Sequence, residues 1–214
     1  MTLLLVHLVQ SITFGYAMNT ESGFMLLVET LTEHKDVFAE VADVGLEAAG
    51  AIPIFGWAVK AWNVKNTFQA KKLYRNTQTF LKSSSITDAQ QFIGRFSSER
   101  EKDELCDSVI QVLIDSEKPL KAQLVSNLLN SIYEGKIPVP DANQLLLIIL
   151  NASVPALMAL ELFFRTSPNG YTSTRSPDAQ TLSPLLMSMG IIHVHGNMTR
   201  VTKLGQLLYQ HTHL

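Results

Sequence analysis

Apolar residues recur about every 3.6 positions over two long stretches early in the chain, residues 22–46 and 57–82. This period predicts an amphipathic helix in each stretch. Between them lies an uncharged run, residues 48–59, which contains two glycines and Pro53. The run is too short to cross a bilayer as one helix, and proline disfavours helical geometry at the residue before it. We therefore predict a buried turn between the two helices.

Capping residues delimit the next helices. The pair Thr87-Asp88 can cap a short helix to about residue 96, and the segment Ser97-Ser98-Glu99-Arg100-Glu101 fits the cap of a longer helix to about residue 115. Pro119 suits the first turn of a third helix, and Gly135 suits its left-handed end. Because leucine and isoleucine recur on one side between these two residues, this third helix is predicted to face the core.

A strongly apolar segment, residues 145–164, has almost the length of a transmembrane span. Asn151, Ser153, Pro155 and Glu161 interrupt it. Polar breaks and a proline at mid-depth are costly in a single span. We predict two consecutive buried helices instead, the first capped by Asp141, with a joint at residues 152–155.

The last fifty residues combine a helix with a hairpin. Residues 166–177 are rich in Ser, Thr and Pro, which predicts a loop, and residues 178–189 read as a helix. Two short strands, residues 191–195 and 198–201, flank the turn pair Gly196-Asn197. Thr202 then suits the N-cap of a final helix to about residue 211. This order is typical of the end of a winged helix.

The predicted fold class is mostly α, a helical bundle followed by a winged-helix-like C-terminal unit with one short β-hairpin. We expect a helical domain at residues 18–135 and the winged-helix-like domain at residues 136–214. Residues 1–17 are apolar and carry no Lys, Arg, Asp or Glu. They form a first helix, an extension upstream of a start at Met18, or a signal sequence without the usual basic region.

Composition narrows the functional classes. The 214 residues are 46% hydrophobic and 17% charged, which is typical of a folded globular chain. The net charge of −2 gives no overall attraction to nucleic acid or anionic lipid. Cys106 is the only cysteine, so an intramolecular disulfide and a cysteine-rich zinc site are both excluded. Acidic neighbours raise a thiol pKa, and we interpret Cys106 as a small core residue.

The strongest local charge pattern is in the helix predicted at residues 57–82. It holds six cations and no acid, with aromatic residues between them, whereas the helix before it is mostly acidic. The two helices are therefore expected to pair with each other. An anionic membrane surface and nucleic acid are the alternatives. The candidate contact residues for a partner or an anionic surface are Trp57, Lys60, Trp62, Lys65, Lys71, Lys72 and Arg75.

The C-terminal unit is a weak candidate for reading DNA. The predicted helix at residues 178–189 offers only Gln180 as a long polar side chain, whereas reader helices use Arg, Lys, Asn or Gln. Residues 165–214 contain four cationic side chains and one acidic one, a small positive excess for neutralising DNA phosphates. His193 and His195 share one strand face, but a metal site is not predicted because nothing fixes a rigid ligand set.

Several short segments together resemble a group of bacterial proteins. They are Ile52-Pro53-Ile54-Phe55-Gly56, Lys71-Lys72-Leu73, Phe80-Leu81, Lys121-Ala122, Gly135-Lys136-Ile137, the stretch from Leu186 to Ile192, and the stretch from Thr202 to Leu207. Residues 24–214 resemble small helical proteins of bacterial mobile elements and phage-defence regions, including the abortive-infection type. The resemblance implies a role in phage defence and carries no catalytic residues.

The expected function is that of a non-enzymatic interaction protein, because the sequence holds no phosphate-binding loop, zinc-protease motif or nucleophile elbow. It is expected to act through a protein partner, a second copy of itself or the inner membrane, without catalytic, cofactor-binding or metal-binding residues. The expected location is the cytoplasm, with peripheral attachment to the inner membrane as an alternative. A winged-helix DNA-binding regulator is the alternative function.

Overall fold

The computed structural model describes residues 23–33 and 67–212. These residues form nine α-helices and one small antiparallel sheet. The helices are α2 (Gly23–Thr32), α6 (Thr67–Ser83), α7 (Ala89–Ile93), α8 (Glu99–Asp115), α9 (Pro119–Tyr133), α10 (Val139–Asn151), α11 (Val154–Thr166), α12 (Pro177–Ser188) and α13 (Lys203–Thr212). The strands are β1 (Tyr171–Ser173), β2 (Ile192–His195) and β3 (Met198–Val201). The mostly helical fold class is confirmed.

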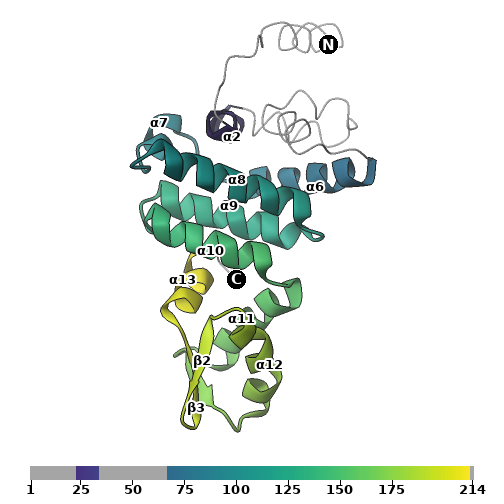
Figure 1. Ribbon diagram of the computed structural model, residues 1–214, viewed down its shortest axis with the longest axis vertical. Coiled ribbons are helices and arrows are strands. Elements are labelled where there is room, and N and C mark those ends of the chain that lie inside the picture. The colour runs from purple at the N-terminus through teal and green to yellow at the C-terminus, as the bar shows by residue number, and fades with distance from the viewer. Residues whose placement is uncertain (1–22, 34–66, 213–214) are drawn as a thin grey trace, which may run out of the picture.

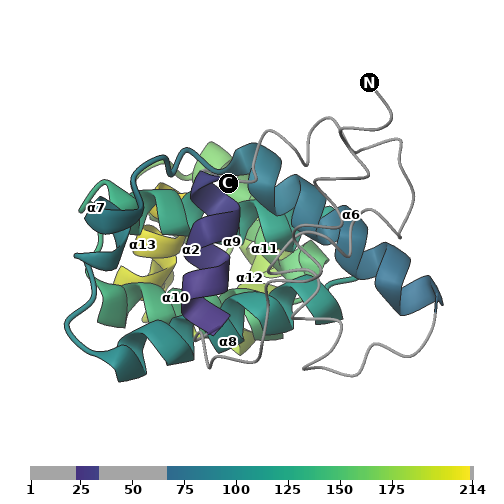
Figure 2. The same cartoon turned by 90° about the horizontal axis from the view of Figure 1, so that it is seen from above.

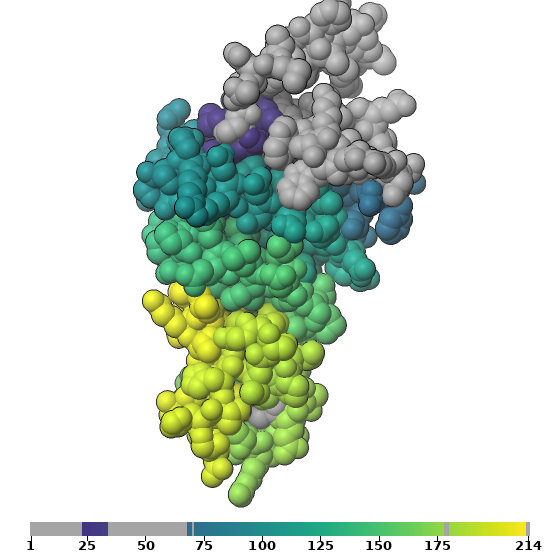
Figure 3. Space-filling model, in the orientation of Figure 1, coloured from purple at the N-terminus to yellow at the C-terminus, as the bar shows by residue number. Residues whose placement is uncertain are grey.

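The helices stack in layers (Figure 1). Helices α8, α9 and α10 lie one below another, α6 packs against α9 and α8, and α2 crosses over α8 (Figure 2). The C-terminal unit, from α11 to α13, extends below these layers (Figure 3). One continuous hydrophobic core runs from Phe24 in α2 to Leu208 in α13.

The predicted capping signals are confirmed at several helix ends. The side chains of Asp88 and Ser98 accept hydrogen bonds from the backbone N–H groups of Gln91 and Glu101. Gly135 has a φ of +73°, which a residue with a Cβ adopts only under strain. The two long helices predicted at residues 22–46 and 57–82 are confirmed only at α2 and α6, because their other residues lie outside the described part.

The start of α10 differs from the prediction. The helix begins at Val139 with Pro138 as its N-cap, so Asp141 lies in the first turn rather than capping it. Proline is tolerated there because the first N–H groups of a helix have no intrahelical partner. Asp141 still favours this end, since the helix dipole is positive at its N-terminus.

The apolar segment forms two helices, as predicted. α10 ends at Asn151 and α11 begins at Val154, with Ser153 as its N-cap, and the two helices are bent by 118°. Among the described residues no single helix is long and apolar enough to cross a membrane. Within residues 23–33 and 67–212, length and composition would allow a span only for this bent pair.

The sheet contains one strand that the sequence pattern does not reveal. Residues 166–177 were predicted as a loop, yet β1 lies within them and pairs antiparallel with β3. The strand order is β1-β3-β2. β1 has only three residues, none of them apolar except the ring of Tyr171, so its pairing depends on β3 lying alongside rather than on alternation of its own.

Helix α13 joins the C-terminal unit to the layers above it. Its Tyr209 ring stacks on Phe164 with 4.1 Å between ring centroids. Asn127 of α9 donates a hydrogen bond to the carbonyl oxygen of Thr212 over 2.7 Å. Gly205 lies against the backbone of Ile191, where a Cβ would collide with the carbonyl oxygen. The domain boundary expected at residue 135 remains a prediction, and α10, which follows it, packs against α8 and α9.

Candidate interaction surfaces

The structure describes three of the seven candidate contact residues. Lys71, Lys72 and Arg75 lie on α6, whereas Trp57, Lys60, Trp62 and Lys65 lie outside the described part. Lys71 and Arg75 are exposed, and Lys72 is half-buried. The predicted pairing with the acidic helix stays a prediction, because most of the acids concerned also lie outside the described residues.

Polar side chains of α6 bind the end of α8. The Nη2 of Arg75 donates to the carbonyl oxygen of Glu117 over 2.5 Å, and the Nζ of Lys72 lies 3.5 Å from the carbonyl oxygen of Asp115. The last carbonyl groups of a helix have no intrahelical partners and carry partial negative charge. Two of the candidate cations therefore stabilise a helix terminus.

Asn76 is the buried member of this contact. Its Nδ2 donates to the carbonyl oxygens of Leu113 and Ser116, over 2.8 Å and 2.7 Å. The side chain is fully buried. Because both acceptors belong to the end of α8, this amide fixes where α6 crosses α8. Local sequence patterns do not indicate this role, since the two helices are separated by α7 along the chain.

The second surface is apolar and lies on α10, α11 and α12. Large hydrophobic side chains of these helices are 40% to 55% exposed, far more than core residues are. They are Leu147, Met158, Leu162, Leu185 and Met187. Single exposed hydrophobic residues are ordinary, whereas several on neighbouring elements mark an interaction site. We refer to these five side chains as the apolar surface.

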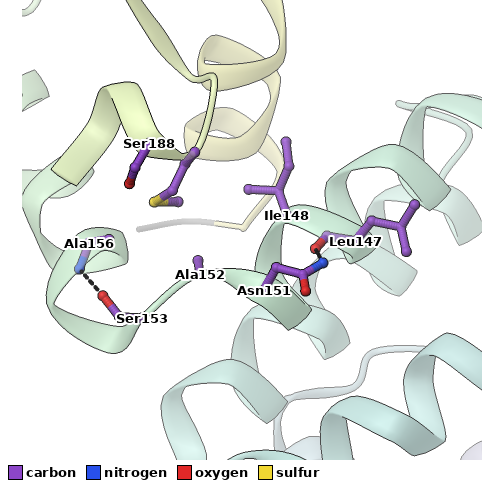
Figure 4. Close-up of a pocket in the computed structure, with 8 residues that line it drawn as sticks. Leu147, Ile148, Asn151, Ala152, Ser153, Ala156 and Ser188 are labelled. Atoms are coloured by element: carbon purple, nitrogen blue, oxygen red, sulfur yellow. Dashed lines mark hydrogen bonds between the residues drawn. The ribbon is translucent and has the colours of Figure 1, made fainter. Parts of the chain in front are cut away.

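A cavity of about 480 Å³ opens where α10, α11 and α12 meet (Figure 4). Its lining residues are Leu147, Ile148, Asn151, Ala152, Ser153, Ala156, Ser188 and Met189. The polar side chains around it already form local hydrogen bonds: Asn151 donates to Leu147, Ser188 donates to Leu185, and Ser153 accepts from Ala156. The cavity therefore offers both apolar and polar contacts, and Leu147 belongs to both the cavity and the apolar surface.

The sequence anticipated the apolar composition of this region but not its exposure. Residues 145–164 were predicted as two buried helices, and one side of each is indeed buried. Their opposite sides are apolar as well, which a helix does not need for packing against one core. This excess of apolar residues is the sequence feature that could have indicated an exposed apolar surface on these helices.

Reactive and metal-binding chemistry is sparse in the described residues. No group of three or more His, Cys, Asp or Glu there could hold a metal ion. Cys106 is buried, as predicted, and burial raises the pKa of its thiol to about 12, with smaller contributions from Asp107 and Asp103. His193 and His195 both lie exposed on β2.

No family model, no curated protein and no solved structure matches this chain. Its function must therefore be argued from its own surfaces. Two have been described above: the contact of α6 with the end of α8, and the apolar surface with its cavity.

Replacing Asn76 by alanine should destabilise the protein. Asn76→Ala removes two buried hydrogen bonds, so the carbonyl oxygens of Leu113 and Ser116 lose their side-chain donor. This loss should lower the free energy of unfolding by about 2 kcal/mol. Lys71→Ala is the matched control, because this exposed side chain on the same helix should contribute within roughly 0.5 kcal/mol. Urea denaturation followed by circular dichroism measures both. Equal losses in the two variants would contradict the anchoring role of Asn76.

The thiol of Cys106 should be almost inert in the folded protein. With a pKa of about 12, roughly one thiol in 10⁴ is ionised at pH 8, against about a quarter of free cysteines. Labelling with a chromogenic disulfide should therefore be at least ~100-fold slower in buffer than in guanidinium chloride. Since Cys106 is the only cysteine, the signal has a single source. Rapid labelling of the folded protein would show that this side chain is accessible.

Proposed function

We propose that this chain is a non-enzymatic helical interaction protein that binds a protein partner through the apolar surface of α10, α11 and α12. The observation that carries the proposal is the exposure of large apolar side chains on adjacent helices. Their burial against a partner would remove that area from water, and each such side chain contributes on the order of 1 to 2 kcal/mol.

The geometry favours a partner with a protruding apolar side chain. Leu147 lines the cavity and is half exposed, so an inserted side chain would contact it. Met158 and Leu162 lie four residues apart on α11 and so share one side of that helix. Methionine adapts its shape to different partners, and Met158, Met187 and Met189 all belong to this region.

The resemblance to phage-defence proteins extends the proposal to a bacterial effector of the abortive-infection type. In this setting the chain would work in the cytoplasm or at the inner membrane. The exposed cations of α6, such as Lys71, support an anionic-surface contact. The hydrogen bonds of Lys72 and Arg75 to the end of α8 instead support a structural role for these two cations.

The apolar surface should crosslink to a partner in cells. A photoreactive benzoylphenylalanine at Leu162 should give a covalent adduct, and Met158→Asp in the same chain should reduce it at least ~10-fold, because a charge at a buried interface is costly. The photoreactive group at Gln123, an exposed polar position on α9, is the matched control. An adduct of twice the 23.8 kDa chain mass would identify a second copy as the partner. No adduct at Leu162, or one unaffected by Met158→Asp, would contradict the proposal.

A winged-helix DNA-binding regulator is the second candidate. Supporting it are the strand order β1-β3-β2, the position of α12 just before the hairpin, and the following helix α13. In this arrangement α12 would be the reader helix. Its exposed residues include Gln180 but no Arg or Lys, which limits the base contacts that it could make.

If the second candidate holds, duplex DNA should be bound with strong salt dependence. A mobility shift at ~50 mM salt should weaken steeply at ~200 mM, because phosphate contacts release counterions. Gln180→Ala should then relax the preference between duplex sequences, and Thr181→Ala, also exposed on α12, serves as the control. Absence of any shift at low salt would exclude this candidate.

A further inference from the structure

The outer face of the three-stranded sheet gathers polar and aromatic side chains in two rows. The strand register pairs Tyr171 of β1 with Arg200 of β3, and Arg200 with His193 of β2. The next row on the same face is Ser173, Met198 and His195. Directly opposed residues in a sheet have Cβ atoms about 5 Å apart. Tyr171, Arg200 and His193 therefore form one continuous strip across the sheet. We call this strip and the second row together the sheet face.

The sheet face is open to solvent, in contrast to the other side of the sheet. Tyr171, Ser173, Arg200, His193 and His195 are all exposed. On the opposite side, Thr199 and Ile192 are buried. Side chains alternate between the two sides of a sheet along each strand. The side chains on the inner side pack against the core, and those on the outer side face solvent. An exposed tyrosine ring beside a guanidinium is thus available for a ligand.

The charge around the sheet face is of one sign. Because β1 and β3 are antiparallel, Arg175 after β1 and Lys203 after β3 are exposed cations near opposite ends of these two strands. Asp178 is the only acidic residue between Glu161 and the end of the chain. A cationic line with an aromatic ring on it combines the two contacts that single strands of nucleic acid need, phosphate neutralisation and base stacking.

We propose that the sheet face binds single-stranded nucleic acid. A base stacks on the ring of Tyr171, Arg200 contacts the adjoining phosphate, and Arg175 and Lys203 contact phosphates on either side. A stacking platform requires an unpaired base, because bases in a duplex are already stacked. The exposed side of α12 lacks the cations that a duplex groove would require, which favours the single strand. This site is separate from the apolar surface and does not rest on the protein-partner function.

Fluorescence anisotropy with a labelled single-stranded oligothymidylate tests the proposal on the full chain. Binding should be measurable at ~50 mM salt and weaken at ~200 mM salt. Tyr171→Ala should weaken it roughly 5- to 100-fold, the range for losing one stacked base, whereas Tyr171→Phe should retain it. Arg200→Gln should weaken it severalfold and reduce the slope of log affinity against log salt by about 0.7, the value for one phosphate contact.

Arg165→Gln is the matched control. Arg165 is also an exposed cation of the C-terminal unit, but it lies on α11, with its Nη1 4.0 Å from Oε1 of Glu161. Its replacement should change the affinity by less than about twofold. Circular dichroism verifies that each variant is folded.

Four results would overturn the proposal. They are no binding at low salt, tighter binding of a duplex of the same length, equal competition by polyglutamate, and an Arg165→Gln effect as large as that of Arg200→Gln. Tighter duplex binding would favour the winged-helix candidate, and equal competition by polyglutamate would mark the face as a site for acidic protein segments. Failure of the photo-crosslinking at Leu162 would leave this proposal unaffected, because the two surfaces share no residue.

Discussion

Helix α9 is buried along almost its whole length. Its neighbours therefore have to pack against its apolar side chains and provide hydrogen-bond partners for its polar ones. Ala122, Leu128 and Ile132 are fully buried, and α6, α8, α10 and α13 all pack around the helix. Two of its asparagine side chains bind the ends of other helices. Asn130 donates to the carbonyl oxygen of Ser83 at the end of α6, and Asn127 donates to the end of α13. A buried polar group without a partner is costly, so these bonds fix where both helices end.

Cations are used in the same way throughout the described layers. Arg95 donates to the carbonyl oxygen of Tyr133 at the end of α9, Lys121 donates to that of Leu150 in α10, and Arg75 donates to that of Glu117 after α8. Burial lowers the pKa of Lys121, the most enclosed of the three, against a smaller opposing effect of Asp115. Positive charge is favourable at these negative helix ends. The basic helix α6 therefore has a structural role in addition to the surface contact proposed for it.

The C-terminal unit differs from these layers because it keeps two unlike surfaces exposed. Its strands lie on one side and α12 on the other (Figure 1). Leu162 and Leu185 belong to the apolar surface, whereas Tyr171 and Arg200 belong to the sheet face. An apolar patch suits a protein partner, and a cationic aromatic strip suits nucleic acid. The two proposed contact surfaces therefore lie in the same unit, and α13 connects this unit to the buried layers.

The sequence alone determined most helix boundaries, since capping depends on local chemistry: Ser98 begins a helix and Gly135 ends one wherever the chain then packs. It also determined the hairpin around Gly196. Only the tertiary structure decided that Tyr171 belongs to a strand, because three polar residues pair there only when β3 lies beside them. It alone placed Asn76 on the end of α8 and left Leu162 exposed. Both outcomes depend on which helices meet, and residues far apart in the chain set that by sharing one core.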